Sequence, residues 1–330
     1  MSGRTVRVAV VGAGQMANLV HYPSLASLDD VEIVGVCDLD PVRRDETADR
    51  WGIAGRFADW TAMVDETAPD AVYVIGPPEQ MYGIWCACLE RGLDLFVEKP
   101  LGLTAHQART LARLARENDR ITQVGFQRRT SPLLERMLAS AREHGDVVHA
   151  VCRFYKNDIR PMSIARDHMM DDGVHAIDTL RHLCGGEVVA ISDVTRRVIV
   201  DDVNFITATL EFDTGAVGLL VNSWTSGRRT FGVEVHAPGF MAEGDLEVGA
   251  RMWTADGHTD LDAAEIAGSS ELYRLGGFRA KSAEFIESVR TREPASSDFA
   301  DALKTMLVAE TILAHALIRE QRTLDAVPGT

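Results

Sequence analysis

Short apolar runs alternate with helical patterns through the first 125 residues of the chain. Val6–Val11 is a continuous run of β-branched residues and alanine, interrupted only by Arg7, which is typical of a strand buried on both faces of a parallel sheet. This alternation predicts a doubly wound parallel sheet of the α/β class. Further strands are expected at 32–37, 71–75, 93–97 and 121–126, and helices from Gly12 to about Ser27 and at 59–67, 79–91 and 105–118.

The pattern changes after Phe126. Polar and apolar positions alternate in longer runs joined by short turns such as Asp213-Thr214-Gly215, which favours an open, mostly antiparallel sheet with one face on helices and one face free. A free face of that size favours a homodimer or homotetramer. The chain is thus expected to form two domains, at 1–125 and 126–330. The expected elements of the second are helices at 131–143, 277–290 and 299–318 and strands at 147–155, 194–200, 204–212, 216–224 and 231–236.

Composition narrows the class of function. The 330 residues are 46% hydrophobic, enough to bury two cores, and carry a net charge of −15. That charge argues against a nucleic-acid partner or an anionic membrane surface, because both need clustered Lys and Arg. No apolar run approaches the roughly 20 residues of a membrane span. Five scattered cysteines favour the reducing cytoplasm, so we expect a cytoplasmic protein that acts on small molecules.

The loop after the first predicted strand reads Gly12-Ala13-Gly14-Gln15-Met16-Ala17, which is a G-x-G-x-x-A pattern. Gly12 permits a tight turn, Gly14 lets the backbone approach a pyrophosphate, and Ala17 allows close packing of helix on strand. The pattern predicts a dinucleotide site. The alternative is an ordinary strand-turn-helix without a ligand.

Asp38 ends the next predicted strand, at the distance where an acid holds a ribose 2′-hydroxyl. A carboxylate there repels a 2′-phosphate, so NAD(H) is favoured over NADP(H). Arg43 and Arg44 follow closely and would soften that preference, which leaves NADP(H) possible. The alternative role for Asp38 is a helix cap.

Two further loops, 76–78 and 98–100, follow predicted strands and end at the same edge of the sheet. Pro100 stops its strand because it lacks a backbone N–H, and it biases Lys99 towards an extended backbone. Open α/β sheets bind ligands at the carboxyl ends of their strands. The alternative is that Lys99 only pairs with Glu98 in a loop. The residues expected beside the cofactor are Gly12, Gly14, Gln15, Met16, Asp38, Gly76, Pro77, Glu98 and Lys99.

Histidines and aspartates cluster between residues 166 and 183. Apolar residues at helical spacing predict a helix with one buried stripe there. His175 follows Asp171 by four residues, so within a helix the carboxylate can accept from the imidazole and fix its tautomer. Packing and N-cap roles are the alternatives. A cluster of His and Asp could also hold a metal ion, but no H-E-x-x-H or paired-cysteine motif is present and no metal is expected.

With these motifs in hand, the chain resembles the Gfo/Idh/MocA oxidoreductase family. The likeness rests on Gly12–Ala17, Glu98-Lys99-Pro100-Leu101 and Asp171-x-Gly173-x-His175-x-x-Asp178, and it extends to the segments at 285–287 and 298–303. The resemblance implies an NAD(P)-binding Rossmann domain joined to an α/β domain whose open sheet forms dimers or tetramers. It also implies oxidation or reduction of a carbinol carbon in a sugar, cyclitol or related polyol.

The resemblance implies a catalytic set as well, because Lys99, Asp171 and His175 match the residues that inositol dehydrogenases use. Hydride transfer from a carbinol requires the hydroxyl proton to move too, and histidine titrates nearest to neutral pH. His175 is therefore the expected general acid/base, with Asp171 orienting it and Lys99 stabilising alkoxide charge. Two other functions stay open: a glycosidase that uses tightly held NAD for transient oxidation, and a non-catalytic nucleotide-sensing regulator.

Two departures from the family pattern affect the expected pocket. Met81 stands where the family usually has a histidine, and the segment 166–170 replaces a glycine-rich lead-in. Basic residues near the second departure suggest an anionic substituent on the substrate, with solvated loop charges as the alternative. The substrate candidates are Arg128, Lys156, Arg160 and His168, and Arg129 lies beside the first of them.

Overall fold

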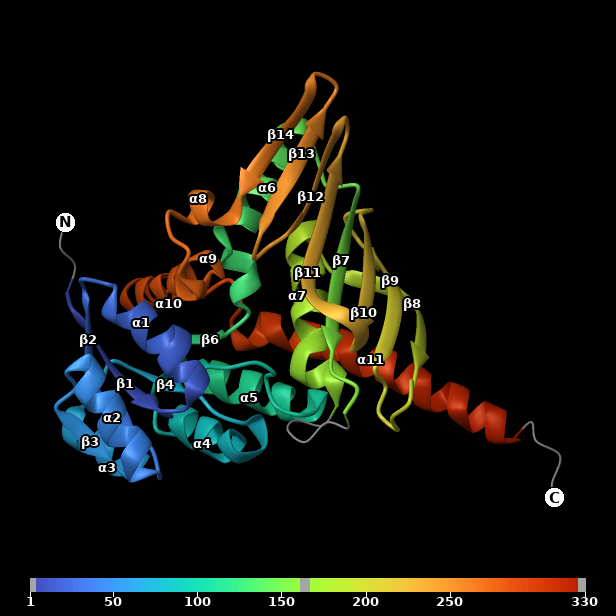
Figure 1. Cartoon of the computed structure of the whole chain (residues 1–330). Coiled ribbons are helices and arrows are strands. Elements are labelled where there is room, and N and C mark those ends of the chain that lie inside the picture. Colours follow the sequence, from blue (N-terminus) through green and yellow to red (C-terminus); the bar gives the residue numbers. More distant parts are fainter. Residues whose placement is uncertain (1–3, 161–166, 326–330) are drawn as a thin grey trace. The chain divides into compact units, whose positions relative to one another are not determined.

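The structure is a computed structural model that describes residues 4–160 and 167–325. Contacts within the chain group it into two compact units. The first comprises Met1–Pro132 and Ala267–Leu303, and the second comprises Leu133–Ile266 and Lys304–Thr330. Each unit has its own sheet (Figure 1). The domain boundary between residues 125 and 126 stays a prediction. The late segment Ala267–Leu303 belongs to the first unit and not to the second.

The first unit is built on a six-stranded sheet in the order β3-β2-β1-β4-β5-β6, with every neighbouring pair parallel. This confirms the predicted doubly wound sheet. All four residues of β4 and of β5 are buried, as expected when both faces of a parallel sheet are covered. The strands are β1 (Val6–Val11), β2 (Val31–Cys37), β3 (Gly55–Phe57), β4 (Ala71–Val74), β5 (Asp94–Val97) and β6 (Thr122–Val124).

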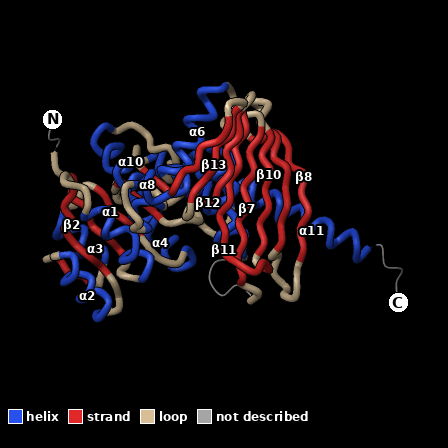
Figure 2. Tube along the Cα trace, turned by 45° about the horizontal axis from the view of Figure 1, so that its top comes forward, coloured by secondary structure: helices blue, strands red, loops and turns tan. Residues whose placement is uncertain are grey.

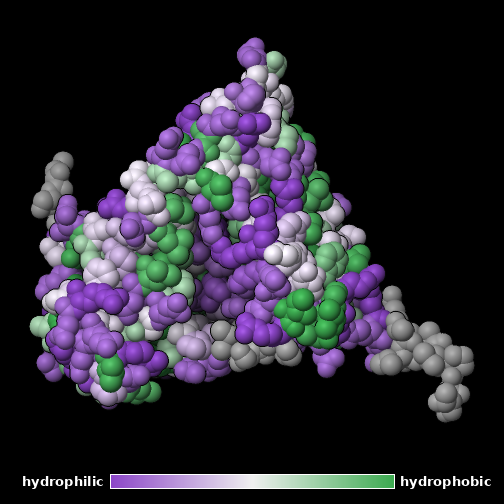
Figure 3. All heavy atoms as spheres, in the orientation of Figure 1, coloured by the Kyte–Doolittle hydropathy of each residue, from purple (hydrophilic) through white to green (hydrophobic). Residues whose placement is uncertain are grey.

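The helices of this sheet follow the predicted alternation, with one addition. The patterns predicted η1 and α1 together, α3, α4 and α5, but not α2 (Pro41–Trp51) or the short β3. The sequence of α2 has little apolar periodicity, because only Thr47 and Ala48 of this helix need to be buried. The surface of the helix is mainly hydrophilic (Figure 3). The other elements are η1 (Ala17–His21), α1 (Tyr22–Ala26), α3 (Trp60–Thr67), α4 (Pro78–Glu90), α5 (Ala105–Glu117) and η2 (Gln127–Thr130).

A cap identifies α2 better than its hydropathy does. The Asp40 carboxylate accepts hydrogen bonds from the backbone N–H groups of Val42 and Arg43, at 2.9 and 3.2 Å. Pro41 occupies the first helical position, where a missing N–H costs nothing. The Asp-Pro pair was therefore a usable signal for this helix.

The late segment of the first unit packs into the same core through α9 (Leu272–Leu275) and α10 (Phe278–Thr291). The rings of Tyr73 and Phe96 stack at 4.4 Å, and Phe285 of α10 meets them edge-on at 5.5 and 5.7 Å. At the sheet edge, Val124 donates its N–H to the Ser297 carbonyl at 2.9 Å. The segment thus covers an edge strand that would otherwise expose unpaired backbone groups.

The second unit holds an eight-stranded sheet in the order β14-β13-β12-β11-β7-β10-β9-β8 (Figure 2). Its neighbouring pairs are antiparallel apart from β7 with β10, which confirms the mostly antiparallel prediction. The strands are β7 (His149–Asn157), β8 (Val188–Arg196), β9 (Phe205–Phe212), β10 (Val217–Ser223), β11 (Thr225–Ala237), β12 (Phe240–Asp245), β13 (Gly249–Thr254) and β14 (Gly257–Asp262).

Two features of this sheet differ from the prediction. The strand predicted at 194–200 is instead β8, Val188–Arg196. Ile199 has a φ of +71° and is 85% exposed, so the apolar run after Arg196 is a loop. The strands β12 to β14 were missed because they are partly exposed and carry few apolar residues, β14 least of all.

One face of the second sheet is covered and the other is partly open. Along β7, Ala150, Cys152 and Phe154 are buried while the residues between them are only half-buried. Leu180 of α7 lies against Gly218 of β10 on the buried side. No helix in the described part of the chain is long and apolar enough to cross a membrane. The helices of this unit are α6 (Pro132–His144), η3 (Met169–Gly173), α7 (Val174–Cys184), α8 (Ala263–Ala267) and most of α11 (Phe299–Asp325).

Candidate active site

The glycine loop after β1 has the shape that its sequence predicts. Gly12 has a φ of +110°, and a Cβ on it would lie 2.0 Å from the Ile75 carbonyl oxygen, so only glycine fits. A Cβ on Gly14 would meet no atom within 4 Å, which leaves the backbone there open to a ligand. The Tyr22 hydroxyl donates to the Gly12 carbonyl at 3.1 Å and braces the turn from behind.

Asp38 is held directly against this loop. Its Oδ2 accepts a hydrogen bond from the Ala13 N–H at 2.8 Å, and its Oδ1 accepts from Arg43 at 3.2 Å. Arg44 instead pairs with Asp45 at 3.1 Å. The carboxylate expected to hold a ribose hydroxyl is thus fixed beside the pyrophosphate turn, and its neighbouring arginine is already paired with it.

A cavity of about 330 Å³ opens beside Gly14 and runs towards α2. Asn18 is one of the residues that line this cavity. Its side-chain amide donates to the Ala13 carbonyl at 3.0 Å and to the Thr47 hydroxyl at 2.8 Å. Trp51 donates its indole N–H to Oδ1 of the Asn18 side chain at 3.2 Å. Asn18 was missed because its side-chain partners, Thr47 and Trp51, lie in the unpredicted helix α2. The cavity is lined by Ala13, Gly14, Gln15, Asn18, Leu19, Arg43, Glu46, Thr47 and Arg50.

The ends of three adjacent strands meet at this edge of the sheet, because β1, β4 and β5 are neighbours. Gly76 follows β4, and Pro77 is the N-cap residue of α4. A Cβ on Gly76 would lie 3.0 Å from the Met81 sulfur, so the methionine side chain covers this turn. The residue that departs from the family pattern therefore lies at the strand end where a cofactor contact was expected.

Glu98 and Lys99 follow β5, and Glu98 is turned inwards. Its Oε1 lies 2.7 Å from Nε2 of His21, and its Oε2 accepts the Lys99 backbone N–H at 3.1 Å. The Lys99-Pro100 peptide bond is cis. A Cβ on Gly125 would lie 2.9 Å from Glu98 Oε1, so the next strand end leaves room for the carboxylate. Glu98 was predicted to lie beside the cofactor, but its buried histidine partner was not predicted.

In the second unit, the histidine and aspartate cluster begins with a π-helical turn. The N–H of Val174 donates to the Met169 carbonyl five residues back, and the α7 helix then continues normally. The turn that holds Asp171 is thus π-helical, and not the ordinary α-helical turn that we expected before His175. Single π turns of this kind occur frequently at functional sites. His175 is buried and Asp171 is half-buried.

Asp172 ties this turn to the sheet. It forms an ion pair with Lys156 of β7, and its Oδ2 accepts the Trp224 indole N–H at 3.5 Å. Lys156 also lies over the ring of Phe154, 5.3 Å from its centroid. Lys156 was expected to bind an anionic substituent, but its charge is compensated within the protein.

Two buried polar side chains lie close to the turn. His168 stacks on Trp224 with ring centroids 4.9 Å apart, and neither ring nitrogen has a hydrogen-bond partner in the described part of the chain. The amide of Asn222 is likewise unpaired among the described residues. A Cβ on Gly173 would lie 3.1 Å from the Asn222 amide nitrogen, so the two are in close contact. Asn222 lies in β10 and Trp224 just after it, and both were missed because neither belongs to a recognisable motif.

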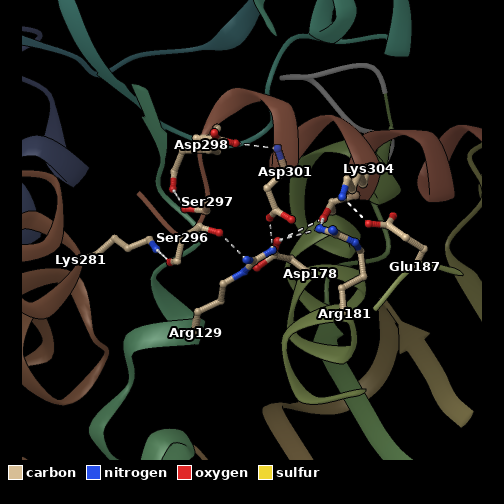
Figure 4. A network of polar contacts seen from close by, with 12 residues as sticks. Arg129, Asp178, Arg181, Glu187, Lys281, Ser296, Ser297, Asp298, Asp301 and Lys304 are labelled. Atoms are coloured by element: carbon tan, nitrogen blue, oxygen red, sulfur yellow. Dashed lines mark hydrogen bonds and ion pairs between the residues drawn. The ribbon is translucent and has the colours of Figure 1, made fainter. Parts of the chain in front are cut away.

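The remaining basic candidates lie in different local environments. Arg160 is 85% exposed and pairs with Asp158 at 3.0 Å. Arg128 is buried within the first unit. Its neighbour Arg129 donates to the Ser296 carbonyl at 2.7 Å and to Asp301 at 2.6 Å, as Figure 4 shows. Arg166, part of the segment that departs from the family pattern, lies outside the described residues.

The last aspartate of the D-x-G-x-H-x-x-D pattern is structural. Asp178 is buried on α7 and accepts the Thr305 hydroxyl at 3.1 Å, while Arg181 donates to the same hydroxyl at 2.9 Å (Figure 4). These bonds join α7 to α11. No group of three His, Cys, Asp or Glu side chains among the described residues is arranged to hold a metal ion.

Four of the five cysteines offer no activated nucleophile. Burial raises the pKa of the Cys37 thiol to about 11, and it raises the pKa values of Cys88 and Cys184 to about 12. Burial also raises the pKa of Cys86. A thiol acts as a nucleophile only as its thiolate, so these side chains stay inert at neutral pH.

Comparison with known proteins matches both halves of this description. The family model described as "Oxidoreductase family, NAD-binding Rossmann fold" matches residues 6–126. The model described as "GFO/IDH/MocA C-terminal domain" matches residues 135–239. Together they cover the glycine loop, the strand end with Lys99 and the turn with Asp171 and His175.

Individual relatives share low to moderate sequence identity with this chain, over different shares of its length. The chain is 33% identical to the D-glucoside 3-dehydrogenase of Escherichia coli over 129 residues, 39% of this chain and 37% of that protein. It is 27% identical to the scyllo-inositol 2-dehydrogenase (NAD(+)) of Bacillus subtilis over 256 residues, 74% of each chain. The structure of a dehydrogenase from Chromobacterium violaceum matches with a TM-score of 0.90 and 21% identity, over 99% of this chain and 100% of that one. This last match shows the shared fold.

Proposed function

We propose that this chain, which belongs to the GFO/IDH/MocA family of NAD-binding oxidoreductases, transfers a hydride between a nicotinamide and a carbinol or carbonyl carbon of a sugar, cyclitol or related polyol. The observation that carries the proposal is the loop from Gly12 to Gly14 braced against Asp38, which has the geometry of a dinucleotide site. Bound nicotinamide would supply the hydride acceptor or donor.

NAD(H) is the cofactor that we propose. The Asp38 carboxylate is suited to a ribose 2′-hydroxyl and repels a 2′-phosphate. Arg43, which could otherwise attract such a phosphate, pairs with Asp38 at 3.2 Å. Arg43 is more than half exposed, so it is free to turn, and NADP(H) is expected as a weaker cofactor.

The proton must move with the hydride, and we assign that step to His175. A buried imidazole can take the hydroxyl proton as a base and return it as an acid. Asp171 would orient the ring through its carboxylate. Lys99 would donate to the reacting oxygen and stabilise the negative charge that develops on it. In this mechanism Lys99 is electrostatic and His175 carries the proton.

The substrate that best suits the second unit is a neutral polyol. Lys156 is paired with Asp172 and Arg160 with Asp158, so neither offers an uncompensated charge to a phosphate or carboxylate. The unpaired nitrogens of His168 and the unpaired amide of Asn222, among the described residues, are suited to hydroxyl groups. Relatives named for a glucoside and an inositol agree with this class.

We further propose a cytoplasmic homodimer or homotetramer that associates through the partly open sheet face of the second unit. All five cysteines are free thiols, as a reducing compartment favours. Along this face Leu219 and Val194 are exposed apolar residues, which a second copy would cover. Sedimentation or light scattering would measure the assembly directly.

A screen of inositols, aldoses, glucosides and sugar phosphates, each with NAD+ and NADP+, tests the function by absorbance at 340 nm. The proposal predicts substrate-dependent NADH formation with a neutral polyol, and its loss in the variants Lys99→Ala and His175→Ala. Glycoside cleavage without net NADH would instead identify a glycosidase. Cofactor binding without turnover of any compound would indicate a nucleotide-sensing protein.

A further inference from the structure

We propose that His21 is a positioning residue, which sets the orientation of Lys99 by holding the Glu98 carboxylate. The inference rests on the proposed function for its catalytic consequence, since Lys99 matters there as the group that polarises the reacting oxygen. Its structural part concerns the first unit alone and can be measured without a substrate.

The contact between His21 and Glu98 is short and enclosed. Nε2 of His21 lies 2.7 Å from Oε1 of Glu98, and the two side chains are 1% and 13% exposed. Because the acceptor is a carboxylate, the ring nitrogen must carry the proton and donate it. A charge-assisted hydrogen bond of this length restricts rotation of the carboxylate.

The rest of the histidine ring has an apolar environment. Phe96 meets it edge-on with centroids 5.5 Å apart, and Phe278 does so at 6.0 Å. Nδ1 is buried without a hydrogen-bond partner in the described part of the chain. An apolar side chain of similar size would satisfy this site better than an imidazole with an orphaned nitrogen. The bond to Glu98 is therefore what the imidazole supplies.

Glu98 passes the constraint to Lys99. Its second oxygen, Oε2, accepts the backbone N–H of Lys99 at 3.1 Å. With both carboxylate oxygens engaged, the backbone of Lys99 is fixed at the end of β5. His21 itself ends η1, the turn that follows the glycine loop, so this chain of contacts also links Lys99 to the element that would hold the pyrophosphate.

The lysine content of the chain makes the proposal directly measurable. There are four lysines, Lys99, Lys156, Lys281 and Lys304. Protein labelled with 13C at lysine Cε should therefore give a simple NMR spectrum in which Lys99→Arg identifies the Lys99 signal. The chemical shift and titration of that signal, recorded without cofactor or substrate, report the environment of the Lys99 amine.

The informative variants are His21→Leu, which removes the donor, and His21→Gln, whose amide can still donate to Glu98. His182→Leu is the matched control, because His182 also pairs with a glutamate, Glu135, at 2.8 Å, but on the helices α7 and α6. We expect His21→Leu to change the Lys99 signal and leave the other lysine signals in place. His21→Gln should restore it, and His182→Leu should leave it unaltered.

In turnover assays with the substrate found by the screen, His21→Leu should lower kcat by about 10- to 100-fold, because small misplacements of a catalytic group have effects of this size. The KM for NAD+ should change less than about threefold, since the glycine loop is intact. Glu98→Gln should act in the same direction, and the double variant His21→Leu/Glu98→Gln should be no worse than the more impaired of the two single variants, because both act on one element.

An unchanged Lys99 signal in folded His21→Leu would overturn the proposal, as would a double variant whose defects multiply. If His21→Leu fails to fold, the Lys99 signal of the variants His21→Gln and Glu98→Gln provides the same test. A Lys99 signal that depends on His21 in a protein without dehydrogenase activity would keep the positioning role and refute the proposed function.

Discussion

The candidate residues of the two units are held in place in different ways. In the first unit, the site is made largely by backbone: Gly12 because no side chain fits there, Gly14 because its backbone is open, and Asp38 because it accepts the Ala13 N–H. In the second unit, pairs of side chains hold the turn around Asp171 in place, and the partners lie far apart in the sequence. The first arrangement can be recognised from a local motif, whereas the second cannot.

The largest effect should come from the proposed proton carrier in the second unit. Replacing His175 by alanine should lower kcat by about 1000-fold, the usual scale for loss of a general acid/base. NAD+ affinity should stay within about threefold, because the cofactor site is made by the other unit. Steady-state kinetics measures kcat, and a binding titration with the nucleotide measures its affinity. Equal losses in kcat and in nucleotide affinity would show that the role of His175 cannot be separated from cofactor binding.

The glycines provide a second separation. Gly12→Ala should weaken NAD+ binding by about 100-fold and lower the melting temperature, because its Cβ would clash with the Ile75 carbonyl at a positive φ. Gly14→Ala should weaken binding without lowering the melting temperature, since no protein atom lies near that Cβ. Calorimetric titration with NAD+ and thermal unfolding test the pair. A stable Gly12→Ala protein with normal affinity would contradict the backbone account.

This contrast explains how far the sequence could be interpreted. The parallel sheet, the mostly antiparallel character of the second sheet and the glycine loop followed from hydrophobic periodicity and one motif, since these depend on neighbours in sequence. The strands β12 to β14 did not, because they carry too little of that periodicity. The π turn before His175 was not predictable from spacing, because its five-residue hydrogen bond is selected by tertiary packing. The links from His21 to Glu98 and from Asn18 to α2 were missed for a related reason: each joins segments whose proximity only the fold establishes.

A smaller effect is expected from the ion pair between Lys156 and Asp172, which supports the turn around Asp171 in the second unit. Lys156→Met should raise the KM for the polyol by about tenfold, because Asp172 loses its partner and the turn loosens. Lys156→Arg, which keeps the charge, should recover most of the affinity. The KM for NAD+ serves as the internal control. Selective loss of anionic substrates, with neutral ones unaffected, would instead restore Lys156 as an anion receptor.

The smallest effect concerns Lys281 and Glu284, an ion pair one turn apart on α10 of the first unit. Although burial alone would raise the pKa of Glu284, Lys281 beside it and hydrogen bonds from Ser296 hold that pKa below its usual value of 4.5. A carboxyl group whose pKa is depressed in the folded state contributes its full stabilisation above its unfolded pKa, and that contribution is lost as the pH falls through the folded pKa. Urea unfolding should therefore show stability falling below about pH 4.5.

The matched variant for this pair is Glu284→Gln, which should be less stable than wild type at pH 7 and show a flatter acid limb. Gln123, which also donates to Glu284 at 2.9 Å, keeps a partner in that variant. Identical acid limbs for the two proteins would mean that other carboxylates dominate the acid response.

Hydride transfer itself is the central claim, and isotope transfer measures it most directly. The polyol identified by the screen, deuterated at its carbinol carbons, would be oxidised with NAD+ and the nucleotide analysed by mass spectrometry. The account predicts NADH that carries deuterium from the substrate, at a rate reduced by the heavier isotope when chemistry limits turnover. Conversion of the polyol with no deuterium in the nucleotide would contradict it.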